Sequence, residues 1–263
     1  MKRDENGERL PILVDGKKVD ISCPEKMYWD YVRKVAPVHD SRGSTLSGTL
    51  VKALALLEDC KSVLDVCGGT GRIALYLTRL GHDVKVVDLS DDMLRIARRK
   101  GLQTERQDAK HLHEPSKSRD AVICLGNSLG GIPSRHGRIQ AIREMVRVAR
   151  KRVVIDCLNR LSELWKIWLP IYTMRILGSY RPGLKLGNDV VTGLELGDIV
   201  WHDRDLDAVL YHHVYDALEL WRNMADAGLK AKAVNPILSK RVVLAGIVQG
   251  HKADMRGGID GSG

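Results

Sequence analysis

Residues 62–72 read Ser-Val-Leu-Asp-Val-Cys-Gly-Gly-Thr-Gly-Arg, an apolar strand that ends in a glycine cluster and opens directly into a helix. Gly68, Gly69 and Gly71 allow positive φ angles and let a ligand approach the main chain closely. The helix that begins near Arg72 points unpaired N–H groups at whatever lies above it. The stretch therefore predicts an anion or nucleotide site at the end of a buried strand.

A second apolar strand, Val84-Lys85-Val86-Val87, ends in Asp88. An acidic residue at this place accepts hydrogen bonds from both hydroxyls of a ribose. The adjacent glycines differ from the Gly-x-Gly-x-x-Gly spacing that fits a pyrophosphate against a helix. Asp65, near the end of the first strand, would repel a pyrophosphate but suits an ammonium group. The loop therefore disfavours a nicotinamide dinucleotide.

These motifs resemble those of the class I S-adenosylmethionine (SAM) dependent methyltransferases, and the resemblance covers most of the chain. Asp65 to Gly71 is similar to the first motif of that family, Asp88 to its ribose-binding acid, and Asp108-Ala109 to its adenine-contacting pair. Asp120 to Ser128 resembles the fourth strand and the loop that faces the methyl group. The resemblance implies SAM as the cofactor.

The C-terminal third adds further matches and one departure from the family pattern. His213-Val214-Tyr215, Leu218-Glu219-Leu220 and Ala227-Gly228-Leu229 resemble the C-terminal strand, helix and turn of the family. Leu229 stands where a phenylalanine is usual, and the whole chain contains no Phe. A second departure lies in the first motif, where Cys67 replaces a glycine or alanine.

The resemblance implies how SAM is held. The methionyl end would lie over the glycine loop, the ribose on Asp88 and the adenine near Asp108 and Ala109, with Leu89 and Met93 against the base. The implied cofactor-binding residues are Asp65, Cys67, Gly68, Gly69, Gly71, Asp88, Leu89, Met93, Asp108, Ala109, Leu125 and Gly126.

Strand and helix patterns alternate from residue 51 onward, which predicts an α/β fold. Strands are expected at 62–66, 83–87, 104–107, 121–125 and 152–155, and helices at 51–57, 72–80, from 91 to about 100, and 134–150. Because parallel strands need helical crossovers, we expect a doubly wound, Rossmann-like, seven-stranded sheet. Val209–Tyr215 and Val242–Val248 would complete this mostly parallel sheet, one of them antiparallel.

Two segments outside the core are expected to form a helical, aromatic cap. Residues 1–50 carry an Asp15-Gly16 hairpin signal and a helix, and the core at 51–250 contains an insertion at 158–205, followed by a mobile tail at 251–263. Eight of the chain's aromatic residues lie in these segments: Tyr28, Trp29, Tyr31, Trp165, Trp168, Tyr172, Tyr180 and Trp201. They either form a wall for a cationic substrate or only pack the cap, which we expect to close over the substrate.

Composition agrees with one enzyme domain. The chain has 263 residues, of which 44% are hydrophobic, enough for a sizeable core. Its five cysteines are scattered without a Cys-x-x-Cys pair, so neither a disulfide framework nor a zinc site is expected. The charged N-terminus and the lack of a long apolar stretch predict a cytoplasmic protein with no membrane span.

Methyl transfer from a sulfonium is an in-line displacement that needs a positioned nucleophile. An amine must only arrive neutral, whereas a hydroxyl needs a base or a metal. The candidate catalytic residues are His213, Asn127 and Tyr31, with His213 favoured as a base over His39, His202 and His212. No metal is expected, because Leu125 holds the place of the acid in metal-dependent O-methyltransferases, and Asp156 with Asn159 offers only half of a magnesium site.

Signatures of nucleic-acid methylation are missing. The loop after the fourth strand reads Leu125-Gly126-Asn127-Ser128 rather than Asn- or Asp-Pro-Pro-aromatic, and the chain has no Pro-Cys dipeptide. Leu125 to Leu129 looks most like that loop in N-methyltransferases of the glycine and sarcosine type. The chain is therefore expected to methylate a small molecule, with an amine as the favoured acceptor.

Net charge leaves a second hypothesis open. The chain carries a formal charge of +9, with basic clusters at Arg95–Lys100 and Arg143–Arg152. RNA is the alternative substrate, although no RNA-binding module is recognisable. A catalytically inactive SAM-binding partner subunit is the third hypothesis, and the intact set of cofactor residues argues against it. The sequence leaves the oligomeric state open.

Overall fold

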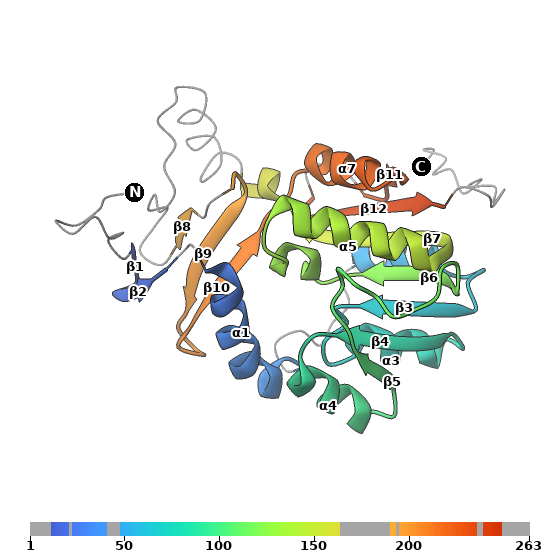
Figure 1. Cartoon of the computed structure of the whole chain (residues 1–263), viewed down its shortest axis with the longest axis horizontal. Helices are drawn as coiled ribbons and strands as arrows, with labels where there is room; N and C mark the ends of the chain where they lie inside the picture. The colour runs from blue at the N-terminus through green and yellow to red at the C-terminus, as the bar shows by residue number, and fades with distance from the viewer. Residues whose placement is uncertain are drawn as a thin grey trace.

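The computed structural model describes residues 12–20, 23–40, 48–163, 190–192, 195–235 and 239–248. In this part of the chain the core is a seven-stranded sheet with the order β11-β12-β7-β6-β3-β4-β5 (Figure 1). Its strands are β3 (Ser62–Val66), β4 (Asp83–Asp88), β5 (Gln103–Arg106), β6 (Arg119–Cys124), β7 (Ala149–Leu158), β11 (Lys230–Ala233) and β12 (Arg241–Ile247).

The strand directions confirm the predicted fold class. β7, β6, β3, β4 and β5 pair in parallel, and β12 runs antiparallel to both β7 and β11. The carboxyl ends of β3 and β6 point toward the N-terminal helix in Figure 1. Residues that follow the parallel strands therefore gather at one edge of the sheet.

Helices cover both faces of the sheet, as a doubly wound fold requires. α2 (Gly48–Ala55), α3 (Arg72–Arg79) and α4 (Asp91–Arg99) bury apolar residues in one core cluster. α5 (Arg135–Val148) and α7 (Ala217–Asp226) bury theirs in a second cluster on the opposite face. The 3-10 turns η2 (Ser128–Gly131) and η3 (Arg160–Glu163) follow β6 and β7.

The start of α4 shows how local sequence sets an element. Ser90 Oγ accepts a hydrogen bond from the Met93 N–H, and Asp91 and Asp92 occupy the first turn. Arg98 and Arg99 occupy the last turn, so the charges complement the helix dipole. The predicted helix after Ser90 is confirmed.

The prediction that Val209–Tyr215 completes the core sheet is wrong. β10 (Ala208–His213) belongs to a separate three-stranded antiparallel sheet, hereafter the cap sheet, with β9 (Asp198–Asp203) and β8 (Val190–Thr192). Its place in the core is taken by β11, whose sequence Lys-Ala-Lys-Ala is mostly exposed and carries no apolar strand pattern. An edge strand needs little apolar surface, so its pattern gave no signal.

The helix of the N-terminal segment lies between the cap sheet and the core, and the hairpin that precedes it lies on the other side of the cap sheet (Figure 1). β1 (Ile12–Val14) and β2 (Lys17–Val19) form the predicted hairpin, and α1 (Pro24–Val35) and η1 (Ala36–Val38) follow. Met27 of α1 packs against Val200 and Tyr211 of the cap sheet, while Val32 and Val35 pack against Met93 of α4.

Parts of the predicted cap lie outside the described residues. These are 1–11, 21–22 and 41–47 of the N-terminal segment, and 164–189 and 193–194 of the insertion, with Trp165, Trp168, Tyr172 and Tyr180. The predicted tail at 251–263 also lies outside the described residues. The proposed division into segments stays a prediction. All five cysteines are unpaired. Within the described ranges, no helix combines the length and apolar character needed to cross a bilayer.

Candidate active site

A pocket of about 230 Å³ opens at the carboxyl ends of the core strands. Five residues predicted to bind the cofactor line it, namely Cys67, Asp88, Leu89, Asp108 and Ala109. The opposite wall comes from α1 and from the segment around η2, through residues that include Glu25, Tyr28, Trp29, Ser128 and Gly131. The pocket therefore spans β3, β4 and the segment after β5, with the N-terminal helix as its cover.

The glycine loop after β3 has no room for side chains. A Cβ atom on Gly68 would lie 2.7 Å from the Asp65 carboxylate, and one on Gly71 would lie 2.3 Å from Leu102 Cδ1. Gly69 and Gly71 also adopt positive φ angles of 57° and 73°. Cys67 has a φ of 55°, which explains why a glycine is usual there.

Asp88 is held in place by main-chain donors. Its Oδ2 accepts a hydrogen bond from the Gly69 N–H and its Oδ1 accepts one from the Ser90 N–H, both at 2.9 Å. The carboxylate is only 7% exposed, and burial raises the pKa of Asp88. Each oxygen keeps a further lone pair, so the group can accept two hydroxyl hydrogens.

Asp65 lies beneath the glycine loop and is 1% exposed. Among the described residues its Oδ2 has no hydrogen-bond partner. Burial, with the charge of Asp88 adding to it, raises the pKa of Asp65 to about 7. A buried carboxylate oxygen without a partner is costly, so a cationic or hydrogen-donating ligand group would stabilise the ionised form of Asp65.

A hydrogen-bonded cluster, hereafter the Thr70 cluster, joins the segment after α1 to the glycine loop. Thr70 Oγ1 donates to Asp40 Oδ1 at 2.6 Å and lies 3.1 Å from His39 Nδ1. Lys100 Nζ donates to the Thr70 carbonyl at 2.8 Å and pairs with Asp40 Oδ2 at 2.5 Å. Burial lowers the pKa of His39. Sequence reasoning missed this cluster, because no local pattern links residues so far apart.

The structure places Tyr28, not Tyr31, in the pocket. Glu25, Tyr28 and Trp29 share one face of α1, and a Cβ atom on Gly131 would lie 2.7 Å from the Tyr28 ring. Tyr31 is absent from the pocket lining and packs against the apolar cluster that α1 and η1 form with Met93 of α4. Burial, followed by the charge of Asp88, raises the pKa of Tyr28 well above its ordinary value. Helical spacing from Glu25 is the signal that points to Tyr28.

Asn127 follows β6 and has a fixed amide orientation. Its Oδ1 accepts a hydrogen bond from the Leu158 N–H at 2.8 Å, so its Nδ2 is the donor to His212 Nδ1 at 2.9 Å. His212 is partly buried and stacks on Trp201 with 5.2 Å between ring centroids. Burial, aided by the positive charge of Arg241, lowers the pKa of His212 to about 4.

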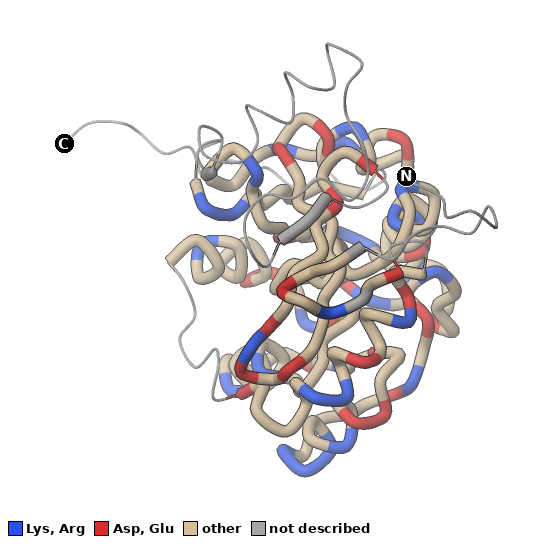
Figure 2. The backbone as a smooth tube through the Cα atoms, turned by 90° about the vertical axis from the view of Figure 1, so that its left-hand side faces the viewer, with Lys and Arg blue, Asp and Glu red and all other residues tan. Residues whose placement is uncertain are grey.

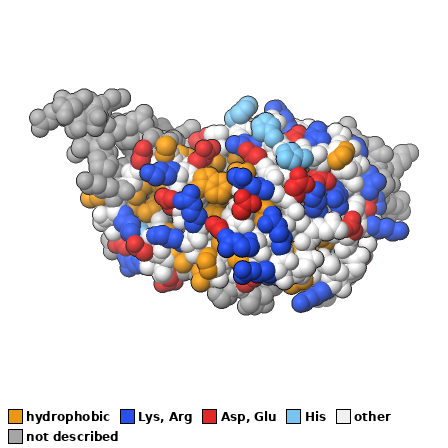
Figure 3. Space-filling view, turned by 60° about the horizontal axis from the view of Figure 1, so that its bottom comes forward, with side chains coloured by type: hydrophobic (Ala, Val, Ile, Leu, Met, Phe, Trp, Pro, Cys, Tyr) orange, Lys and Arg blue, Asp and Glu red, His pale blue; other side chains and the backbone are white. Residues whose placement is uncertain are grey.

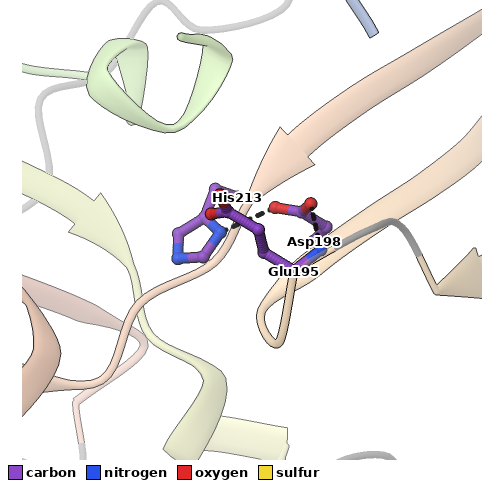
Figure 4. Close-up of side chains that lie close together, drawn as sticks. All are labelled: Glu195, Asp198 and His213. Atoms are coloured by element: carbon purple, nitrogen blue, oxygen red, sulfur yellow. Dashed lines mark hydrogen bonds and ion pairs between the residues drawn. The ribbon is translucent and has the colours of Figure 1, made fainter. Parts of the chain in front are cut away.

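His213 points to the opposite side of β10 and is 1% exposed. Its Nδ1 lies 2.7 Å from Asp198 Oδ1 and its Nε2 lies 2.8 Å from Glu219 Oε1. Figure 4 shows His213 beside Asp198 and Glu195. Both ring nitrogens therefore face carboxylate oxygens, and a ring that donates from both has no lone pair for removing a proton.

Glu195, Asp198 and His213 offer ligand atoms within 4.8 Å of one another, the spacing of a metal site. Two arginines already supply positive charge there. Arg138 Nη2 pairs with Glu195 Oε2 at 2.5 Å, and Arg160 Nη1 pairs with Glu219 Oε2 at 2.8 Å. Together with Glu219, these residues form an ion-pair network that joins the cap sheet to α5, η3 and α7.

Family comparisons agree with this geometry. A family model described as a methyltransferase domain matches residues 63–152. Rabbit (Oryctolagus cuniculus) glycine N-methyltransferase is 30% identical over 145 residues, which cover 46% of this chain and 49% of that protein. The ubiquinone/menaquinone biosynthesis C-methyltransferase UbiE of Zymomonas mobilis is 22% identical over 245 residues, covering 88% and 94%. The chain spans about half the length of the first of these relatives.

Solved structures share the fold. The CcbJ methyltransferase from Streptomyces caelestis superposes with a TM-score of 0.58 at 17% identity, covering 84% of this chain and 97% of that one. An S-adenosylmethionine-dependent methyltransferase from Clostridium acetobutylicum gives 0.57 at 15% identity, covering 82% and 98%. Residues 63–152 thus form a methyltransferase domain, and the chain has the fold of the SAM-dependent methyltransferases.

SAM is therefore the cofactor, and the residues present fit it. The unpartnered oxygen of Asp65 matches an ammonium group, and the free lone pairs of Asp88 match two ribose hydroxyls. At Gly69 a Cβ atom would meet nothing closer than Met93 Sδ at 3.9 Å, so the loop backbone is open to a ligand at this glycine.

Other predicted residues of this methyltransferase lie around the pocket rather than in its lining. Met93 packs against α1, and Leu125 is buried in the core. The Gly126 N–H donates to Asp156 Oδ2 at 3.2 Å, and Arg241 Nε donates to Asp156 Oδ1 at 2.5 Å. Asp156 is thus engaged on both oxygens. His202 lies far off in the cap, between Asp15 and Asp207.

Proposed function

We propose that this chain is an N-methyltransferase that transfers the methyl group of SAM to an amine of a small molecule. The observation that carries this proposal is the state of the two adjacent histidines. Both ring nitrogens of His213 are engaged by carboxylate oxygens, and the accepting nitrogen of His212 is taken by Asn127. An amine that arrives neutral needs no base, whereas a hydroxyl does, so these paired nitrogens favour an amine.

The order of the sheet supports a division of the crevice. We place the adenosine over β4 and β5, where Asp88 and Asp108 line the pocket, and the methionyl end over the loop after β3. SAM supplies there a methyl carbon bonded to a positively charged sulfur. The acceptor then lies over the ends of β6 and β7, the next strands in the sheet. Asn127 follows β6, and Asp156 lies near the end of β7.

The N-terminal part of the cap is placed to exclude water from the reaction site. Tyr28 and Trp29 close one side of the pocket and contact each other edge to face, with ring centroids 5.5 Å apart. Aromatic faces attract cations, and exclusion of water strengthens electrostatic interactions with a sulfonium. We propose that α1 and the cap sheet together cover cofactor and acceptor during transfer.

Among known relatives, the glycine N-methyltransferases support the amine assignment. The match to the glycine/sarcosine N-methyltransferase of Parasynechococcus marenigrum is 34% identity over 102 residues, which cover 36% of each chain. Both names describe methylation at nitrogen of small amines. This similarity supports an amine acceptor without naming it.

RNA is the second candidate substrate, but arginines of the protein's basic cluster at 143–152 pair with carboxylates of the same chain. Arg152 pairs with Asp59, Arg150 pairs with Asp120, and Arg147 pairs with Glu144. Basic and acidic residues are also interspersed along the tube of Figure 2 and on the face shown in Figure 3. The positive charge is thus mixed with acidic neighbours rather than gathered in one basic stripe, which disfavours RNA.

A labelling experiment tests the proposal. The enzyme is incubated with tritiated-methyl SAM and, in parallel, with a small-molecule extract, total RNA and a set of simple amines. We expect label in small molecules, bound through nitrogen, and none with the Asp88→Ala variant. Label in RNA alone, or on oxygen or carbon alone, would overturn the proposal.

A further inference from the structure

His212 occupies a specific place relative to the proposed acceptor. It lies on β10, and its Nδ1 contacts Asn127, the residue that immediately precedes the pocket residue Ser128. Asn127 follows β6, on the side of the sheet away from Asp88 and Asp108. His212 is thus attached to the loop where the acceptor half of the crevice is proposed to begin.

Hydrogen bonding fixes which nitrogen of His212 carries the proton. The Leu158 N–H can only donate, so Asn127 Oδ1 accepts and Asn127 Nδ2 must donate to His212 Nδ1. A neutral imidazole that accepts at Nδ1 carries its hydrogen at Nε2. The ring therefore offers a hydrogen-bond donor and no base. Within the described chain, Nε2 has no hydrogen-bond partner.

The surroundings of His212 favour an oxygen as the missing partner. The indole of Trp201 stacks on the imidazole with an interplanar angle of 21°, which holds the ring plane fixed. Burial, aided by the charge of Arg241, lowers the pKa of His212 and keeps the imidazole neutral. Arg241 Nη2 is itself buried without a partner among the described residues. Of these two donors beside the loop after β6, Arg241 Nη2 is the buried one, and a buried donor calls for an acceptor that the described residues do not supply. An oxygen of a bound molecule there would also lie within reach of the partly exposed His212 ring.

We propose that His212 recognises the methyl acceptor by donating a hydrogen bond from Nε2 to an oxygen of that molecule, so that the substrate is an amine that also carries a carboxylate or a hydroxyl group. This inference rests on the proposed N-methyltransferase function and deepens it. His212 acts as a binding residue in this scheme, with Asn127 and Trp201 as positioning residues.

Matched acceptors and matched variants test the inference. Methyl transfer is measured for amines in sets of three. The members of a set are identical except for one group, which is a carboxylate, a hydroxyl or a methyl. The sets cover several aliphatic chain lengths and an aromatic series. His212→Phe keeps the stacking area and loses the donor, while His212→Gln keeps a donor. His136→Phe, on the exposed surface of α5, is the control.

We expect the wild type to prefer one oxygen-bearing member of each set. His212→Phe should raise the KM for that member by 10-fold or more, as expected for loss of a hydrogen bond worth about 1.5–3 kcal/mol to a charged group. It should leave the KM for the methyl-bearing member unchanged, and His212→Gln should recover part of the loss. Which oxygen group is preferred distinguishes carboxylate from hydroxyl.

Binding of the demethylated cofactor, S-adenosylhomocysteine (SAH), and the melting temperature report whether each variant is folded. If His212→Phe does not fold, the preference of the wild type within each set decides the question. Equal use of all three members, or equal losses for all three in His212→Phe, would overturn the inference while leaving N-methylation intact. If nitrogen is methylated in no member of the sets and in no extract component, the proposed function itself fails.

Discussion

The Asp88 carboxylate accepts a hydrogen bond from the Gly69 N–H at 2.9 Å, which fastens the end of β4 to the glycine loop after β3. The first prediction follows from this contact. Asp88→Ala should weaken SAH binding by about 1.5–3 kcal/mol, because hydrogen bonds to a charged group and the support of the loop are lost together. Calorimetry measures the change, and Asp91→Ala, an exposed acid on α4, is the control. Unchanged affinity in Asp88→Ala would contradict the assignment.

SAM affinity should depend on pH through Asp65. Burial raises the pKa of this carboxyl to about 7, so near neutrality it is partly protonated without ligand. A cationic ammonium favours the ionised form, so affinity should rise as the pH increases from about 6 to 8, with release of up to one proton. Calorimetry in buffers of different ionisation enthalpy counts that proton. Asp65→Asn should bind more weakly and lose the dependence, and a wild type with no dependence would refute the contact.

The raised pKa of Asp65 also makes the free energy of unfolding depend on pH. The folded ligand-free protein binds the Asp65 proton more tightly than the unfolded chain does, for which a value near 3.8 applies. This group therefore stabilises the fold more at low pH, and its contribution should decline between about pH 4 and 7. Urea unfolding of the wild type against Asp65→Asn isolates the effect, because the variant lacks the titrating group.

The Thr70 cluster should control cofactor affinity rather than the chemical step. Asp40→Asn removes the charge that Lys100 Nζ meets at 2.5 Å and weakens the support of Thr70. We expect the free energy of SAH binding to weaken by about 1–2 kcal/mol, with kcat at saturating SAM nearly unchanged. Asp30→Asn, an exposed acid on α1, is the matched control. A loss confined to kcat would show that the cluster acts elsewhere.

His213 should be a structural residue rather than a base. His213→Ala leaves Asp198 and Glu219 without their shared partner in a buried site, so the free energy of unfolding should fall by about 3–5 kcal/mol. Urea unfolding measures this, with the exposed His136→Ala as control. If His213 were the base, the variant would keep its stability and lose kcat instead.

Acid should weaken the same network. Burial alone would raise the pKa of Asp198 and of Glu219, but hydrogen bonds and charge from His213 hold both below their ordinary values. Carboxyls with lowered pKa stabilise the fold above their unfolded pKa and lose that contribution as pH falls through the folded one. Wild-type stability should therefore drop below about pH 4, and the drop should be smaller in His213→Ala.

Hydrogen exchange distinguishes the two parts of the cap. α1 lines the cofactor pocket, so residues 24–35 should gain protection with SAH alone. Protection of the cap sheet, at 190–192 and 198–213, should increase further only when an acceptor is added, if this sheet closes over the substrate. A cap sheet that is fully protected without ligands would be a fixed wall, and closure would be the wrong description.

The sequence by itself determined the core and the cofactor end of the site. Glycine spacing, strand-end acids and helix caps act within a few consecutive residues, so residues 62–72 and Ser90 specify their turns locally. Because the carboxyl ends of parallel strands share one edge, strand order alone predicts that Asp88 and Asp108 lie together, and both line the pocket. The sequence did not predict β11, because an exposed edge strand needs no apolar pattern.

Only the tertiary structure decided the contacts around Asn127 and on the two faces of β10. His212 and His213 are neighbours in a strand and point to opposite faces, and nothing local says which face meets Asn127 and which meets Asp198. The choice between Tyr28 and Tyr31 depends likewise on how α1 is rotated against the core. Such contacts join residues far apart in the chain, and their energies depend on burial that exists only after the layers have packed.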